Sequence, residues 1–199
     1  MADPSPQAAR SERRDAGSGW RYGVGVDDRS SRKASFAPVV DDQTRLLVLG
    51  SLPGEASLRA AQYYAHPQNQ FWRLMGAVIG ADLAGASYDA RLEQLRSHGV
   101  GLWDVVRTAH RRGSLDTAIR GHQPNALPEL AATLPNLAAI AFNGGTASKI
   151  GRETLGPDSR WSLVSLPSSS PAYTLRFDAK LAQWLTLRRY LGPGASPVR

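Results

Sequence analysis

Four short apolar runs, separated by helical patterns, constrain the fold of this 199-residue chain more than any other feature. Each run is four to six residues long and is bounded by turn-forming residues such as Gly, Pro, Asn or Asp. Runs of this length with these flanks are typical of buried strands. The predicted strands are Leu46–Leu49, Val100–Trp103, Leu137–Phe142 and Trp161–Leu166.

Between the runs, apolar residues recur at the spacing of an amphipathic helix. In residues 69–79, Phe71, Leu74 and Val78 fall on one stripe. Further helices are predicted from Tyr88 to near Gly99 and over residues 128–134, 146–155 and 177–191. Strands that alternate with helices predict an α/β three-layer sandwich, in which a mainly parallel four-stranded sheet is flanked by helices.

The two ends of the chain have a different composition from the middle. Residues 1–35 are rich in Ser, Gly, Pro, Arg and Asp, and residues 192–199 read GPGASPVR with Leu191 before them. Such segments bury too little apolar surface to offset their chain entropy. We therefore expect a disordered tail over 1–35, one domain over 36–191 and a disordered end over 192–199.

The excess of positive charge lies in the expected domain. Residues 46–199 hold 16 Lys and Arg against 10 Asp and Glu, a net charge of +6, whereas residues 1–45 have a net charge of +1. A basic folded domain suits a polyanionic partner such as nucleic acid. An Arg-rich composition alone would give the same balance, so charge leaves both interpretations open.

Each predicted strand leads directly into polar or Gly/Pro-rich residues: 51–54, Asp104, 143–145 and 167–172. In a parallel sheet these ends share one edge, where ligands bind. The simpler interpretation is that strands must end in turn residues. Four such loops together favour a pocket, although they do not identify its ligand.

Several common sites are excluded by the motifs. Residues 50–54 match neither the dinucleotide-binding nor the Walker pattern, and no nucleophile-elbow motif is present. The chain has no Cys, and its four His residues lack metal-ligand spacing. We expect no metal and no organic cofactor. There is also no apolar run of membrane-spanning length and no secretory signal, so we expect a cytoplasmic protein.

The segment QYYAHPQNQFW at residues 62–72 combines aromatic side chains, a His and carboxamides just before a predicted helix. One interpretation is structural, with Phe71 in the core and Asn69 capping the helix. The other is functional, with an aromatic wall for stacking a flat ring and Asn69 holding a water. Tyr64 and His66 of this segment are candidate substrate-binding residues.

The chain resembles the hypoxanthine-DNA glycosylase branch of the uracil-DNA glycosylase superfamily. The resemblance rests on LGSLPGEASL at 49–58 and YYAHPQNQFW at 63–72. It extends through GLWDVV at 101–106, GSLD at 113–116, AFNG at 141–144 and LPSSSPA at 166–172. It spans about residues 36–191 and implies a parallel sheet flanked by helices, in agreement with the pattern of strands.

The resemblance implies a role for each segment. The first-motif loop would lie against the flipped base, Phe71 would stack on it, and Asp104 would read its edge, with Asn143 nearby. The implied first-motif residues are Gly50, Ser51, Leu52, Pro53 and Gly54. The second motif, which would grip DNA phosphates, comprises Ser168, Ser169, Ser170, Pro171 and Ala172.

The first motif departs from that of the best-known members, which carry Asp or Asn there to activate or position the attacking water, where this chain has Ser51. A neutral hydroxyl is a poor base. The resemblance therefore implies that Asn69 positions the water, so the expected catalytic residues are Asn69 and Ser51. An amide orients a water but does not take its proton, so we expect modest turnover.

The expected partner is DNA that contains a deaminated base, bound by a monomer near the nucleoid. Arg107, Arg111 and Arg112 lie on a predicted loop after the second strand and are candidates for DNA binding, unless they only form a solvated surface. No Lys falls in a pocket loop, which predicts base release without strand cleavage.

Three alternatives remain open from the sequence. The protein could prefer uracil over hypoxanthine. It could be a non-catalytic module that binds damaged or single-stranded DNA, because Ser51 is not a carboxylate. It could also be a small-molecule enzyme on the same scaffold, because a fold does not fix a function.

Overall fold

The central sheet consists of four parallel strands, as predicted. The computed structural model describes residues 32–191. The strands are β2 (Leu46–Gly50), β3 (Val100–Asp104), β6 (Ala139–Asn143) and β7 (Ser162–Leu166), in the spatial order β3-β2-β6-β7. All pairs are parallel, and each strand begins and ends within two residues of its predicted bounds. Every residue of β2 is buried, which explains why its sequence is a continuous apolar run.

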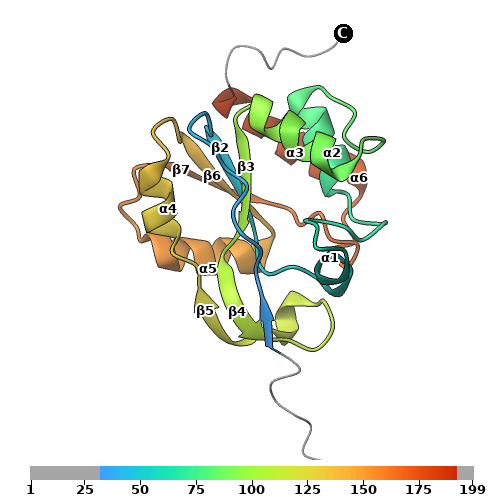
Figure 1. Ribbon diagram of the computed structural model, residues 1–199, viewed down its shortest axis with the longest axis vertical. Helices are drawn as coiled ribbons and strands as arrows, with labels where there is room; N and C mark the ends of the chain where they lie inside the picture. The colour runs from blue at the N-terminus through green and yellow to red at the C-terminus, as the bar shows by residue number, and fades with distance from the viewer. Residues whose placement is uncertain (1–31, 192–199) are drawn as a thin grey trace, which may run out of the picture.

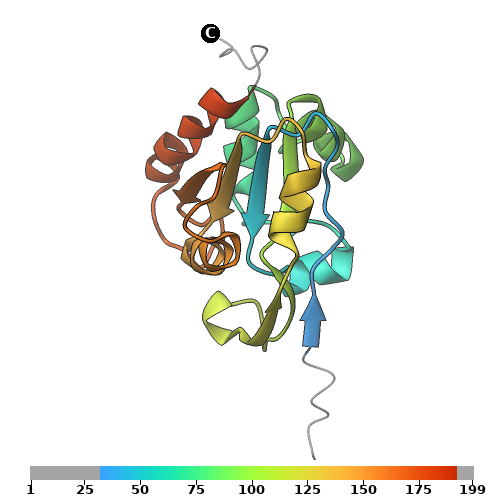
Figure 2. The ribbon, with the colours of Figure 1, turned by 90° about the vertical axis from the view of Figure 1, so that its left-hand side faces the viewer.

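Helices cover both faces of this sheet and complete the predicted three-layer sandwich (Figures 1 and 2). The helices are α2 (Phe71–Ile79), α3 (Tyr88–Ser97) and α6 (Phe177–Trp184) on one face, and α4 (Leu127–Thr133) and α5 (Gly145–Leu155) on the other. Leu46 and Val48 join the first core and Leu47 and Leu49 the second, because successive side chains of a strand point to opposite faces. The predicted last helix continues beyond α6 as the 3-10 helix η3 (Leu185–Tyr190).

A second sheet was not predicted. It contains β1 (Arg32–Ala34), β4 (Val106–His110) and β5 (Arg120–Pro124) in the antiparallel order β1-β4-β5, with the 3-10 helix η2 (Asp116–Ala118) between β4 and β5. The prediction that a loop follows β3 is therefore wrong, because this region contains two strands. The sequence RGHQP of β5 is fully exposed and has low strand propensity, so its conformation depends on pairing with β4.

Two smaller differences concern the ends of elements. Residues 32–35, which the sequence assigns to the disordered tail, are ordered by pairing with β4, and the Ser35 amide also donates to the Arg107 carbonyl at 2.9 Å. The rest of the expected tail, 1–31, and the expected C-terminal end, 192–199, lie outside the described residues. The short helix α1 (Glu55–Ala60), which follows the first-motif loop, was also not predicted.

The carboxyl ends of the parallel strands point toward α1 and the second sheet (Figures 1 and 2). Gly50 at the end of β2 pairs with Asp104 at the end of β3, and Asn143 pairs with Leu166 in the same way on the other side. The strand register thus brings the four polar loops to one edge. Within residues 32–191, no helix has the length and apolar character needed to cross a membrane.

Candidate active site

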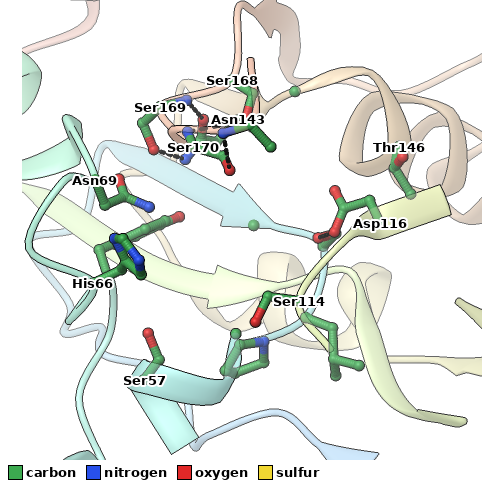
Figure 3. Close-up of a pocket in the computed structure, with 18 of the residues that line it drawn as sticks. Ser57, His66, Asn69, Ser114, Asp116, Asn143, Thr146, Ser168, Ser169 and Ser170 are labelled. Carbon is green, nitrogen blue, oxygen red and sulfur yellow. Dashed lines mark hydrogen bonds between the residues drawn. The ribbon is translucent and has the colours of Figure 1, made fainter. Parts of the chain in front are cut away.

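A cavity of about 550 Å³ opens at this edge, a volume in the range of small-molecule pockets. Its floor is formed by the strand ends, and its walls come from the first-motif loop, residues 63–69, the loop between β4 and β5, and the serine loop 168–173 (Figure 3). Most of the site residues expected from the sequence line it: Gly50, Ser51, Leu52, Pro53, Gly54, Tyr64, His66, Asn69, Asp104, Asn143, Ser168, Ser169, Ser170, Pro171 and Ala172. Phe71 and the three expected DNA-binding arginines do not.

The first-motif loop is held from behind by Arg111. This residue is 1% exposed, and its guanidinium donates to the carbonyl oxygens of Leu52, at 3.0 Å, and of Pro53. Because both carbonyls are fixed, the loop is tied in one conformation against the cavity. The expectation that Arg111 contacts DNA is therefore wrong: its position directly after β4 turns it into the protein.

The Ser51 hydroxyl faces a carboxylate that the sequence did not associate with it. Its Oγ donates to Oδ1 of Asp116 at 2.6 Å, and Asp116 also lies 3.8 Å from the Arg111 guanidinium. Burial raises the pKa of Asp116, while the hydrogen bond from Ser51 and the charge of Arg111 oppose that rise. Asp116 belongs to η2, in the loop between β4 and β5, and lines the cavity.

Asp104 provides a buried carboxyl group on the floor of the cavity. Its side chain is 3% exposed, and Oδ2 has no hydrogen-bond partner. Burial raises the pKa of Asp104 to about 8; nearby Asp116 adds to this effect and Arg111 opposes it. Asp104 therefore holds its proton at neutral pH and can donate a hydrogen bond to a ligand. A Cβ on Gly50 would lie 2.6 Å from Oδ1, so a larger residue at position 50 would displace the Asp104 side chain.

The aromatic wall is formed by Tyr64. Its ring stacks on Phe71 with 3.7 Å between centroids and an interplanar angle of 12°, and Phe71 itself is fully buried. The expectation that Phe71 faces the base is thus corrected, because Tyr64 covers Phe71 on this side and lines the cavity in its place. The backbone of Tyr64 has φ of 54°, a left-handed conformation that is uncommon for a residue with a side chain.

Asn69 lies just before α2 and reaches the cavity. Its Oδ1 accepts a hydrogen bond from the amide of Phe71, the first residue of α2, at 3.0 Å. The N-cap position itself is Gln70, so the expected cap by Asn69 is shifted by one residue. Nδ2 is the hydrogen-bond donor that this side chain can offer to a ligand or water. His66 lies beside Asn69 on the same wall (Figure 3), and its Nδ1 accepts from the Gln68 amide at 3.2 Å.

Asn143 holds the serine loop to the end of β6. Its Nδ2 donates to Ser169 Oγ and its Oδ1 accepts from the Ser169 amide, both at 2.8 Å. Gly144 follows with φ of 108°, and a Cβ there would lie 3.1 Å from Ser168 Cβ. The serine loop is also tied to the Asn69 segment, because the Gln70 amide donates to the Ser169 carbonyl at 3.0 Å. Asn143 therefore has a structural role in addition to lining the cavity.

The other two expected DNA-binding arginines lie outside the cavity. Arg107 lies on β4 and Arg112 in the loop between β4 and β5, and both are exposed. Arg32 on β1 and Arg120 on β5 are exposed on the same sheet as Arg107. Arg107 also donates to Gln123 Oε1 at 3.0 Å, across the β4–β5 pair.

Sequence reasoning missed the roles of Asp116 and Arg111. The segment GSLD was part of the family resemblance, but no local pattern indicates that Asp116 meets a serine 65 residues earlier. Three or more His, Cys, Asp or Glu side chains that could hold a metal ion do not gather anywhere in residues 32–191. The absence of a cofactor stays a prediction.

Comparison with known proteins identifies relatives over the same region. Residues 37–190 match the family model described as the uracil DNA glycosylase superfamily. A protein from Methanosarcina barkeri named hypoxanthine DNA glycosylase is 47% identical over 113 residues, covering 57% of this chain and 72% of the relative. One of the same name from Methanosarcina acetivorans is 37% identical over 158 residues, covering 79% of this chain and 99% of the relative.

A solved structure agrees with the fold. The solution NMR structure of a protein from Methanosarcina acetivorans, described as a candidate uracil DNA glycosylase, is 37% identical. It superimposes with a TM-score of 0.71, covering 79% of this chain and 97% of the other. The family match spans nearly all of the described residues and includes every wall of the cavity, so this chain belongs to the uracil DNA glycosylase superfamily.

Proposed function

We propose that this protein is a monofunctional DNA glycosylase that flips a deaminated base out of DNA, hypoxanthine before uracil, and hydrolyses its bond to the sugar. The proposal depends above all on one observation: Asn69, Asp104, Ser51 and the serine loop all line a single cavity. The names of the two hypoxanthine DNA glycosylase relatives support the choice of base.

The cavity offers a flat surface and a proton donor for the base. The flipped ring would lie against Tyr64, since base-aromatic stacking accepts any planar base. The protonated carboxyl of Asp104 would donate to an acceptor atom of the base and then release its proton to the leaving group, because its pKa of about 8 keeps it protonated at neutral pH. A purine such as hypoxanthine has ring nitrogens that can receive this proton.

Asn69 would orient the attacking water through Nδ2, its hydrogen-bond donor. The amides of the first-motif loop would support charge that develops on the departing base. Flipping favours a weakly paired base, because it requires a few kcal/mol and least for a mispaired nucleotide. Hypoxanthine opposite thymine and uracil opposite guanine both satisfy this condition.

Two surfaces would hold the DNA. The serine loop, fixed by Asn143, would contact phosphates next to the flipped nucleotide through hydroxyl groups and amides. Exposed arginines on the second sheet and in the loop after β4, Arg107 and Arg112 among them, would bind phosphates farther along the strand and make the affinity depend on salt.

The residues of the cavity also support base release without cleavage of the DNA strand. None of its lining residues is a lysine, and the Lys180 ammonium donates to the Tyr173 carbonyl at 2.8 Å. A Schiff base with the sugar is therefore not expected. We further propose that the protein acts as a monomer in the cytoplasm, near the nucleoid.

Base release from matched duplexes containing hypoxanthine, uracil or xanthine tests the proposal. We expect hypoxanthine to be released fastest, and Asn69→Ala to slow its release by about 100-fold. Asn136→Ala is the matched control, because Asn136 lies on the surface between α4 and β6.

Each of the three alternative functions predicts a different outcome in these assays. Faster release of uracil would favour the uracil-preferring enzyme, and tight DNA binding without any base release would favour the binding module. A DNA affinity that does not respond to salt would favour a small-molecule enzyme. Normal release by Asn69→Ala would refute the role of Asn69.

A further inference from the structure

We propose that Asp116 is the carboxylate that this active site otherwise lacks: it takes the proton of the attacking water through Ser51 and offsets the positive charge that develops on the sugar. The inference rests on the proposed function and adds a positioning residue on a second loop. It answers a chemical need, because the Nδ2 of Asn69 orients a water but cannot accept its proton.

The geometry joins two loops that are far apart in the sequence. Ser51 directly follows β2, and its Oγ lies 2.6 Å from Asp116 Oδ1, in the range of charge-assisted O–H···O bonds. Both residues line the cavity. Figure 3 shows Asp116 across the cavity from Asn69, so the attacking water would lie between the Asn69 amide and the Ser51–Asp116 pair.

The surroundings hold Asp116 in place through the Ser51 hydrogen bond and a long ion pair with Arg111. The Arg111 guanidinium lies 3.8 Å away and is itself fixed by the carbonyls of the first-motif loop. Asp104 on β3 and Tyr64 are the other titratable groups that influence this corner. The pKa of Asp116 is raised, chiefly by burial, which brings a carboxylate base closer to the working pH.

The proposed reaction requires the two carboxyl groups to differ in protonation state, with Asp104 protonated and Asp116 ionised. The water oxygen forms a bond to C1′ as the bond from C1′ to the base nitrogen breaks, and that electron pair leaves with the base. The water proton passes to Ser51 Oγ as the Ser51 proton passes to Asp116. Asp104 gives its proton to the base, and exchange with solvent restores both carboxyl groups.

The test measures single-turnover release of hypoxanthine between pH 5 and 9, with DNA affinity measured in parallel. For Asp116→Asn we expect a loss of about 100-fold in rate, little change in DNA affinity, and loss of the acidic limb of the pH profile. Asp116→Glu should recover part of the rate. Asp178→Asn is the matched control, because Asp178 is an exposed residue of α6 whose ion-pair partner is Arg176.

Two further variants keep the test decisive if Asp116→Asn folds poorly. Ser51→Ala removes the relay but leaves Asp116 beside Arg111, and it should also slow base release. Asp116→Ala should regain activity when formate is added, which a purely structural role does not predict. Wild-type rate and an unchanged acidic limb in folded Asp116→Asn would overturn the inference. Absence of base release by the wild type would instead overturn the proposed function.

Discussion

Replacement of Asp104 by Asn should remove a large part of the pH dependence of stability. Asp104 is 3% exposed, and burial raises the pKa of its carboxyl from 3.8 to about 8. In the unfolded chain the carboxyl loses its proton near pH 4, whereas the folded protein keeps it to about pH 8. The folded state therefore binds more protons between these limits, and its stability falls as the pH rises through them.

The magnitude follows from the shift in pKa. Each pKa unit is equivalent to about 1.4 kcal/mol, so the free energy of unfolding should fall by roughly 4 kcal/mol between pH 5 and pH 9 because of Asp104 alone. The decline should level off above pH 8, where Asp104 ionises in the folded protein as well. Asn has nearly the same shape and no charge, so Asp104→Asn should lack this component.

Denaturation by urea at a series of pH values, followed by fluorescence of the tryptophans, measures the effect. The quantity of interest is the difference between the wild type and Asp104→Asn, since all other titrating groups are common to both. Parallel curves from pH 5 to 9 would refute the argument that burial keeps this carboxyl protonated.

Three further predictions follow from contacts around the cavity. Gly50→Ala should sharply reduce base release in the oligonucleotide assay, because the new Cβ would lie 2.6 Å from Asp104 Oδ1; normal release would mean that the floor adapts freely. Asn143→Ala should lower the free energy of unfolding by about 1–3 kcal/mol through loss of its two hydrogen bonds to the serine loop. Chemical denaturation measures this change, and an unchanged free energy of unfolding would contradict the structural role of Asn143. Arg112→Gln should weaken DNA binding and lower the salt slope by roughly 0.9 in a titration of affinity against salt, whereas Arg111→Gln should chiefly reduce stability. Equal salt slopes for the wild type and Arg112→Gln would exclude a phosphate contact.

The tertiary structure also changes how the first motif is understood. By sequence, Ser51 is an uncharged substitute for Asp or Asn and indicates a weak catalyst. In the fold, the same hydroxyl is paired with Asp116, and the loop behind it is fixed by Arg111. A carboxylate supplied by another loop is therefore present beside Ser51.

The sequence by itself determined the central sheet, its flanking helices and most of the cavity. Apolar runs and helical spacing are local signals, and parallel strands must end at one edge, so Ser51, Asp104, Asn143 and the serine loop had to lie near one another. The resemblance added Asn69 to the same cavity, where it is found.

Only the tertiary structure decided which side chains meet. The strands β4 and β5 depend on their mutual pairing rather than on local propensity, and their hairpin carries Asp116 to Ser51. Burial of Arg111 and coverage of Phe71 by Tyr64 likewise arise from packing between distant segments. No periodicity in the sequence encodes such contacts, because they depend on how separately formed elements fit together in space.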